Sequence, residues 1–205
     1  MKVIIFGATG GVGQSVVKQA IEAGFELTAF VRTPAKLETS HENLQVIQGD
    51  AFNPTEVSAA IAGHDAGVSC LGSSKGMKKS TELQDMTEHI VKGMHEHHVE
   101  RIIYTASAGV HRELTGVMGK LMMWLLKNPL IDHRAAVARI EKADLLYTIA
   151  RPMGLSGKEF TGEYREDPTS TPSNSSTIPR ADLAHFIIKA LEDPSYEMTS
   201  IGLAT

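Results

Sequence analysis

The 205-residue chain is poor in several features that would place it in other protein classes. Its single cysteine, Cys70, excludes an internal disulfide and is typical of a reducing compartment. Its 20 basic and 24 acidic residues give a net charge of −4, which argues against a nucleic-acid-binding surface. No segment reaches the roughly 18 consecutive apolar residues that cross a bilayer. The first residues follow a strand pattern and not a signal-peptide pattern, so we expect a cytoplasmic protein with no membrane or nucleic-acid partner.

Two further absences concern reactive groups. Cys70 lies in an apolar run, 67–71, which predicts a buried, unreactive thiol. The histidines within 94–98 lie at a predicted helix end and have no matching set of ligands elsewhere, so we predict no metal site.

The glycine-rich segment near the N-terminus carries the strongest positive signal. An apolar run over 1–6 predicts a buried parallel strand, and apolar residues at helical spacing follow from Val12. Glycines between a strand and a helix allow a pyrophosphate to approach the backbone, where free N–H groups and the helix dipole favour an anion. We therefore predict a dinucleotide site at Gly7, Ala8, Thr9, Gly10, Gly11, Val12 and Gly13. The spacing G-x-x-G-x-x-G differs from G-x-G-x-x-G, and the alternative is an ordinary turn with surplus glycines.

Strand and helix patterns alternate along most of the chain. Further strands are predicted at 27–31, 44–47, 67–71, 101–105, 145–150 and 200–204, and helices at 54–62, 81–97, 135–142 and 179–191. Such alternation predicts an α/β fold, a Rossmann-type doubly wound parallel sheet, with ligands beyond the carboxyl ends of the strands. We expect one domain over 1–205. Residues 155–205, with a Ser- and Pro-rich loop at 161–178, would form a small substrate-side appendage.

The end of the second predicted strand indicates which nucleotide is bound. An NAD site places a carboxylate there to bind the ribose 2′-hydroxyl. This chain has Arg32, Thr33 and Lys36 instead, which suit a 2′-phosphate, so we predict NADP(H) in preference to NAD(H). The alternative is a solvated loop with two cations. Asp50, with Ala51 beside it, ends the third strand and would meet the adenine amino group or cap the next turn.

These segments resemble the atypical short-chain dehydrogenase/reductases with NAD(P)H-binding domains. The resemblance covers nearly the full length and continues at 105–108, 148–152 and 180–184. Within that family the chain is most similar to the biliverdin-IXβ reductase/flavin reductase group. The NmrA-type regulators, which bind a dinucleotide without obvious turnover, are a second set of relatives.

The resemblance implies which loops surround the nicotinamide and its ribose. They are those carrying Leu71, Gly72, Ser73, Ala106, Ser107, Pro152, Met153 and Gly154. It also implies that Ser107 is the superfamily's serine, which would hydrogen-bond a substrate carbonyl or propionate. The chain departs from the biliverdin reductases at Gly154, where those relatives carry a histidine, which argues against biliverdin itself as the acceptor.

The superfamily's usual catalytic pair, Tyr-x-x-x-Lys, does not occur. Tyr147 is followed at that spacing by Arg151, but it lies inside a predicted strand and is interpreted as packing. The helix register places His133 and Val137 at the two positions. His133 is a candidate proton donor because an ordinary imidazole titrates near neutral pH. The alternatives are a solvent-facing histidine and a proton taken from water.

Residues 114–134 repeat apolar side chains at helical spacing, many of them methionine or leucine. They are interpreted either as a core-facing helix or as an adaptable pocket or lid above the crevice. Together these patterns favour an NADPH-dependent reductase, a monomer or homodimer, acting on a flavin, quinone or other conjugated small-molecule acceptor. The alternative is a non-catalytic NADP(H)-binding sensor. A sugar-nucleotide epimerase is disfavoured because the C-terminal region is short.

Overall fold

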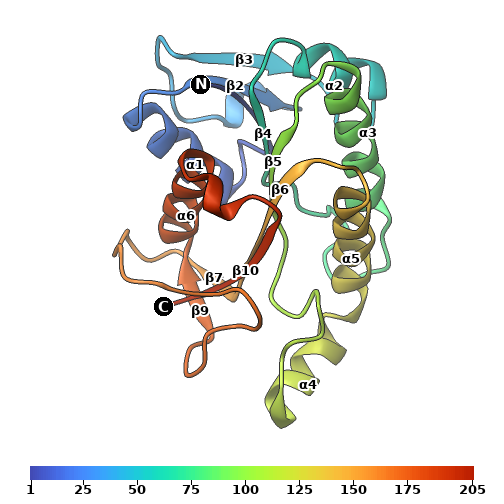
Figure 1. The fold of residues 1–205 in the computed structure, drawn as a ribbon, viewed down its shortest axis with the longest axis vertical. Coiled ribbons are helices and arrows are strands. Elements are labelled where there is room, and N and C mark those ends of the chain that lie inside the picture. The colour runs from blue at the N-terminus through green and yellow to red at the C-terminus, as the bar shows by residue number, and fades with distance from the viewer.

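The computed structural model describes all 205 residues and is organised around one eight-stranded sheet (Figure 1). The strand order is β3–β2–β1–β4–β5–β6–β10–β8, and every neighbouring pair is parallel except β10 and β8. Its strands are β1 Lys2–Phe6, β2 Glu26–Val31, β3 Leu44–Gln48, β4 Ala66–Ser69, β5 Arg101–Thr105, β6 Leu146–Pro152, β8 Arg165–Asp167 and β10 Thr199–Ala204. Strands β7, Gly154–Ser156, and β9, Thr177–Pro179, form a separate parallel pair.

Helices cover both faces of the sheet, as Figure 1 shows. Helices α1 (Gly11–Glu22) and α6 (Arg180–Glu192) pack together on one face. Helices α2 (Pro54–Ile61), α3 (Glu82–Glu96) and α5 (Lys127–Glu141) cover the other. The predicted doubly wound fold is confirmed. None of these helices combines the length and the apolar character needed to cross a bilayer.

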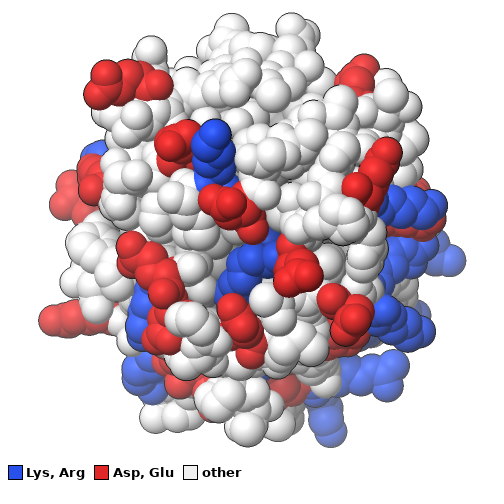
Figure 2. Space-filling model, turned by 45° about the horizontal axis from the view of Figure 1, so that its top comes forward, with Lys and Arg blue, Asp and Glu red and all other residues white.

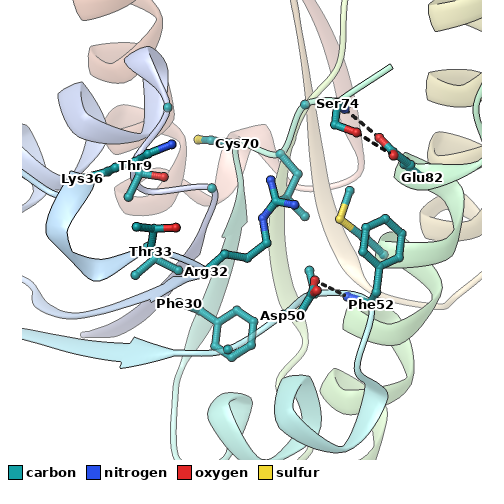
Figure 3. A pocket seen from close by; sticks show the side chains of 18 residues that line it. Thr9, Phe30, Arg32, Thr33, Lys36, Asp50, Phe52, Cys70, Ser74 and Glu82 are labelled. Atoms are coloured by element: carbon teal, nitrogen blue, oxygen red, sulfur yellow. Dashed lines mark hydrogen bonds between the residues drawn. The ribbon is translucent and has the colours of Figure 1, made fainter. Parts of the chain in front are cut away.

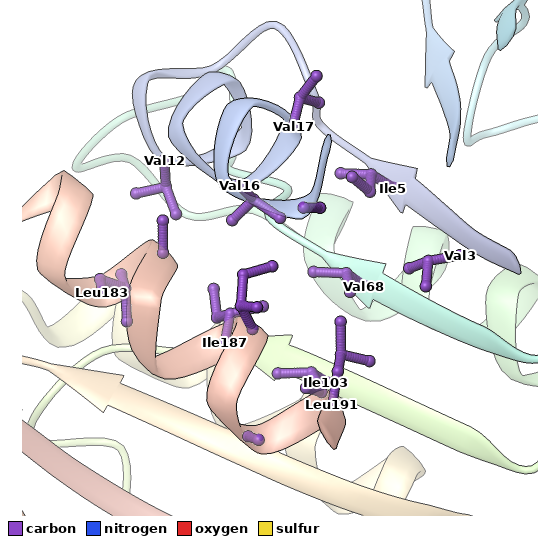
Figure 4. Packing of buried hydrophobic residues seen from close by; sticks show 14 of the residues in the cluster. Val3, Ile5, Val12, Val16, Val17, Val68, Ile103, Leu183, Ile187 and Leu191 are labelled. Carbon is purple, nitrogen blue, oxygen red and sulfur yellow. The ribbon is translucent and has the colours of Figure 1, made fainter. Parts of the chain in front are cut away.

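Alternating residues of the central strands feed two separate cores. Val3 and Ile5 of β1 pack toward α1 and α6, where Val16 and Ile187 meet them (Figure 4). Ile4 belongs to the cluster on the opposite face. Burial of such a side chain contributes about 1.5–3 kcal/mol, and burial on both faces explains why the strands read as continuous apolar runs.

The chain reverses direction across the sheet at β1. The connections run outward from β1 to β2 and β3, and then return to β4 on the other side of β1. This reversal opens a crevice at the carboxyl ends of β1 and β4, which is where open α/β sheets bind ligands. Over the face seen in Figure 2, acidic and basic side chains are interspersed, with basic ones gathering at one edge.

Several predicted boundaries and one packing interpretation differ from the structure. The helix expected over 135–142 begins at Lys127, because Pro129 falls in the first turn, where proline is tolerated. The strand expected over 67–71 ends at Ser69, so Cys70 lies in the following loop. The 161–178 loop contains β8.

The core-facing interpretation of 114–134 is wrong for its first half. Helix α4, Gly116–Leu125, has no buried residue and projects from the body beyond α5 (Figure 1). Its apolar positions are periodic, but none of them is buried. Periodicity alone cannot distinguish such a helix from a buried one.

Candidate functional site

The glycine turn after β1 has no room for side chains at two positions. Gly7 has a φ of +79°, and a Cβ on it would stand 2.6 Å from the Cys70 carbonyl oxygen. A Cβ on Gly13 would lie 2.2 Å from the Gly7 carbonyl oxygen. The turn is closed by the Gly10 N–H, which donates to that same oxygen at 3.0 Å. This backbone cradle fits a pyrophosphate, because any side chain at these positions would distort it.

Helix α1 begins at this turn without a side-chain cap, so its first N–H groups face outward with the positive end of the dipole. Of the other predicted residues here, Ala8 and Val12 have buried side chains in the α1/α6 core. Only their backbone groups are available to a ligand.

A cleft of about 210 Å³ opens beside the turn, and most predicted nucleotide residues line it (Figure 3). The predicted residues that line it are Gly7, Thr9, Gly10, Arg32, Thr33, Lys36, Asp50, Ala51, Leu71 and Gly72. Sequence reasoning missed Phe30, Val31, Gly49, Phe52, Cys70, Ser74, Glu82 and Met86. Six of these eight residues end β2 or follow β3 or β4, so a wider window at each strand end would have found them, whereas Glu82 and Met86 come from α3.

The cationic end of the cleft is formed after β2. Arg32, Thr33 and Lys36 are exposed, and the Arg32 side chain extends across the opening in Figure 3. Neither Arg32 nor Lys36 forms an ion pair, so both cations are free for a ligand. Asp50 caps the local turn, as its Oδ1 accepts from the Phe52 N–H at 3.1 Å, while α2 is capped by Asn53.

Glu82 organises the loop on the opposite wall. Its carboxylate accepts from the Ser74 N–H at 2.6 Å, the Ser74 hydroxyl at 2.8 Å and the Ser73 hydroxyl at 2.9 Å. Burial opposes ionisation, but these bonds and Lys75 outweigh it and lower the pKa of Glu82. The Ser73 hydroxyl is therefore committed to Glu82, and Ser74 lines the cleft in its place.

Cys70 behaves as predicted. Its side chain is partly buried beside Thr105, with 3.9 Å between Sγ and Oγ1. Burial raises the pKa of the thiol to about 12, so it carries no thiolate near neutral pH.

A second group of predicted residues lies together at the ends of β5 and β6. The Ala106 N–H donates to the Ala150 carbonyl at 2.8 Å and the Ala108 N–H to the Pro152 carbonyl at 2.9 Å, so the Ser107 loop runs beside 152–154. Arg134 fixes this loop by donating to the carbonyls of Gly109 and Val110.

A buried ion pair between Arg151 and Glu113 holds the same loop from the other side. Ser107 is left with one weak bond, from its hydroxyl to the Ala108 carbonyl at 3.2 Å. Its hydroxyl is therefore available to a ligand. Ala106, Pro152, Met153 and Gly154 do not line the nucleotide cleft, and they border this second region instead.

His133 is partly buried inside α5 and does not face open solvent. Its Nδ1 lies 3.0 Å from the Tyr104 hydroxyl, and Tyr104 is fully buried on β5. Burial lowers the pKa of His133 to about 4, against which the nearby Asp132 acts weakly. The imidazole is thus neutral at physiological pH. Asp132 itself accepts from the N–H groups of Leu83 and Gln84 at the start of α3. Tyr147 packs at the edge of the same core, as predicted.

One buried carboxylate ties the start of the 161–178 loop to helix α6. Asp182, in the first turn of α6, accepts from the N–H groups of Thr161 and Gly162 and from the Thr161 hydroxyl. It is fully buried, and it fixes one end of the 161–178 loop.

Comparison with known proteins gives the family. A model of the NAD(P)H-binding family matches residues 7–194, nearly the whole chain. The chain belongs to this family. An uncharacterised chloroplastic protein of Arabidopsis thaliana is 28% identical, over 98% of this chain and 76% of that protein.

Solved structures share the fold at lower identity. A short-chain dehydrogenase/reductase of Veillonella parvula, solved in complex with NADP, has a TM-score of 0.85 and 21% identity over 100% of this chain and 94% of that one. An anaerobilin reductase of Escherichia coli O157:H7 has a TM-score of 0.84 and 20% identity over 100% and 97%. The predicted NAD(P)H-binding family is confirmed by the family model, and these structures share its fold.

Proposed function

We propose that the protein is an NADPH-dependent oxidoreductase that reduces a flavin, a quinone or another conjugated small molecule. The observation that carries the choice of cofactor is the end of β2, where Arg32 and Lys36 line the cleft without ion-pair partners. A planar guanidinium suits a 2′-phosphate, whereas an NAD site needs a carboxylate there. The NADP complex of the Veillonella protein, which has the same fold, supports the choice.

When bound, NADPH supplies a hydride from C4 of its nicotinamide ring. The protein's own contribution is to hold the acceptor against that carbon. Ser107 has a hydroxyl free to hydrogen-bond an acceptor carbonyl, and its loop is held by Arg134 and by the Arg151–Glu113 ion pair. The proton that completes the reduction comes from water in this proposal, because His133 is neutral near pH 7 and gives up no proton there. The role of His133 in this proposal is then a hydrogen bond, and its partner in the structure is the Tyr104 hydroxyl.

A conjugated acceptor is favoured by two observations. The anaerobilin reductase, a structural neighbour over the full chain, is named for a tetrapyrrole-type substrate. Helix α4, which follows the Ser107 loop in the chain, exposes apolar side chains, and methionines such as Met118 and Met122 adapt to flat ligands of different outline.

The decisive experiment is NADPH oxidation, followed by loss of the reduced-nicotinamide absorbance, with FMN, riboflavin, small quinones and biliverdin as acceptors. NADH is assayed in parallel. We expect NADPH-selective turnover with at least one acceptor and a lower kcat/KM for Ser107→Ala. Tight NADPH binding without turnover of any acceptor would refute the enzyme.

That outcome would favour the second candidate, a non-catalytic NADP(H)-binding sensor of the NmrA type. The observation in its favour is the pair His133 and Val137, which stand where a catalytic tyrosine and lysine are usual: the histidine is neutral and the valine is buried.

A further inference from the structure

Arg180, the first residue of α6, is a half-buried cation without a partner. Its guanidinium makes no hydrogen bond and no ion pair in the protein. The other arginines that lack a partner, Arg32 and Arg112, are exposed to water. Among the unpaired arginines, Arg180 is therefore the one whose side chain packs partly against the protein.

The Arg180 side chain lies against the glycine turn. A Cβ on Gly11 would stand 2.8 Å from its Cδ and 2.9 Å from its Nε. A Cβ on Gly157 would be 3.7 Å from its Nη1. The guanidinium therefore sits between the first residue of α1 and the segment that follows β7. The absence of a side chain at Gly11 leaves the space that Arg180 occupies.

This position is electrostatically unfavourable for a cation alone. Arg180 stands at the N-terminal end of its own helix, and Gly11 is the N-terminal residue of α1. Both helix ends carry a partial positive charge, so a positive side chain gains nothing from either dipole. An anion placed between the guanidinium and the free N–H groups of α1 would be stabilised by both.

The ligand of this family carries such an anion, because NAD(P)H contains a pyrophosphate that binds at a glycine turn of this kind. The position of Arg180 indicates which phosphate is involved. Arg32 lies after β2 at the adenosine end of the cleft, whereas Arg180 lies beside Gly157, which closely follows the 152–154 segment predicted to meet the nicotinamide.

We propose that Arg180 binds the nicotinamide-side phosphate of the cofactor and so anchors the dinucleotide opposite to Arg32. The proposal rests on the cofactor binding in the proposed function. It is independent of the acceptor, and of whether the protein turns over at all.

The test compares three ligands: NADPH, NADH and adenosine 2′,5′-bisphosphate, which lacks the nicotinamide-side phosphate. For Arg180→Ala we expect the Kd of both NADPH and NADH to rise about 10- to 100-fold, as for a lost charge-assisted hydrogen bond. The Kd of the bisphosphate should stay within about twofold of the wild-type value. Arg180→Lys, which keeps the charge and loses the planar fork, should fall between wild type and Arg180→Ala.

The matched control is Arg32→Ala, which should weaken NADPH and the bisphosphate while sparing NADH. Gly11→Ala should weaken NADPH and NADH as Arg180→Ala does, because its added methyl would displace the Arg180 side chain. Far-ultraviolet circular dichroism and the Tm of each variant establish that it is folded. If Arg180→Ala does not fold, the Kd values of Arg180→Lys and Gly11→Ala for the three ligands test the proposal instead.

Unchanged NADPH binding in a folded Arg180 variant would overturn the inference while leaving the proposed function intact. An equal loss for the bisphosphate would overturn it too, because it would mean a general distortion of the turn. A wild-type protein that binds none of the three ligands would refute the proposed function itself.

Discussion

Selectivity between NADPH and NADH should depend mainly on one side chain, Arg32. It extends across the nucleotide cleft, exposed and free of ion pairs, at the point where the fold places the ribose. Replacing it with alanine removes the planar group that would grip a 2′-phosphate and leaves the backbone of β2 unchanged.

The expected size of the effect follows from its exposure. A hydrogen bond to a charged group contributes about 1.5–3 kcal/mol, and solvent screening at an exposed site favours the lower end. We therefore expect Arg32→Ala to raise the Kd of NADPH about 10- to 30-fold. The Kd of NADH should change by less than about twofold, because NADH has no 2′-phosphate. Lys36→Ala, which removes a point charge in water, should cost about two- to fivefold.

The assay is a titration of cofactor fluorescence at fixed ionic strength, repeated at higher salt. The matched control is Lys18→Ala, which removes the same charge from the solvent-facing side of α1 and should leave both constants unchanged. Equal losses for NADPH and NADH in Arg32→Ala would refute the assignment, as would an equal loss in the Lys18 control.

Two further predictions concern His133 and helix α4. The pKa of His133 is about 4 in the folded protein, below its ordinary value of 6.5. The unfolded chain therefore takes up the proton first as the pH falls. About 2 kcal/mol of stability should be lost between pH 7 and pH 5 for this reason. His133→Asn should flatten that part of the pH dependence of Tm, and an unaltered slope would contradict the assigned pKa. On α4, Leu121 and Trp124 are 47% and 70% exposed, so serine at both positions should cost under about 0.5 kcal/mol each in urea unfolding. The pair of changes should raise the KM for the acceptor without altering the Kd of NADPH, and losses of about 2 kcal/mol or more per residue would mean that α4 is packed after all.

The cofactor half of the site was predictable because it depends on local sequence. Gly7 and Gly13 are required by a turn closed within a few residues, and Arg32 follows directly from the end of a strand. The role of Glu82 was not predictable in this way. It fixes the loop after β4 from the start of α3, and only the tertiary structure brings Ser73 and Ser74 to its carboxylate.

The same limit applies to the environment of titratable groups. The sequence indicates that His133 stands near the catalytic position, but its pKa is lowered by burial, which only the tertiary structure determines. The same packing brings its Nδ1 within 3.0 Å of the Tyr104 hydroxyl on β5. Likewise, the methionine- and leucine-rich repeat over 114–134 predicts a helix correctly, yet the pattern of α4 cannot say whether anything covers it.

The two halves of the candidate site therefore differ in how they are built. The nucleotide half depends on a backbone turn that leaves no space for side chains at Gly7 and Gly13. The acceptor half that we propose would consist of the Ser107 loop, the 161–178 loop fixed by Asp182, and the exposed helix α4. Loops and exposed helices tolerate replacement without loss of the sheet. It follows that the acceptor cannot be transferred from a structural neighbour that shares only the fold. Assays with varied acceptors, rather than further comparison of folds, are what will identify it.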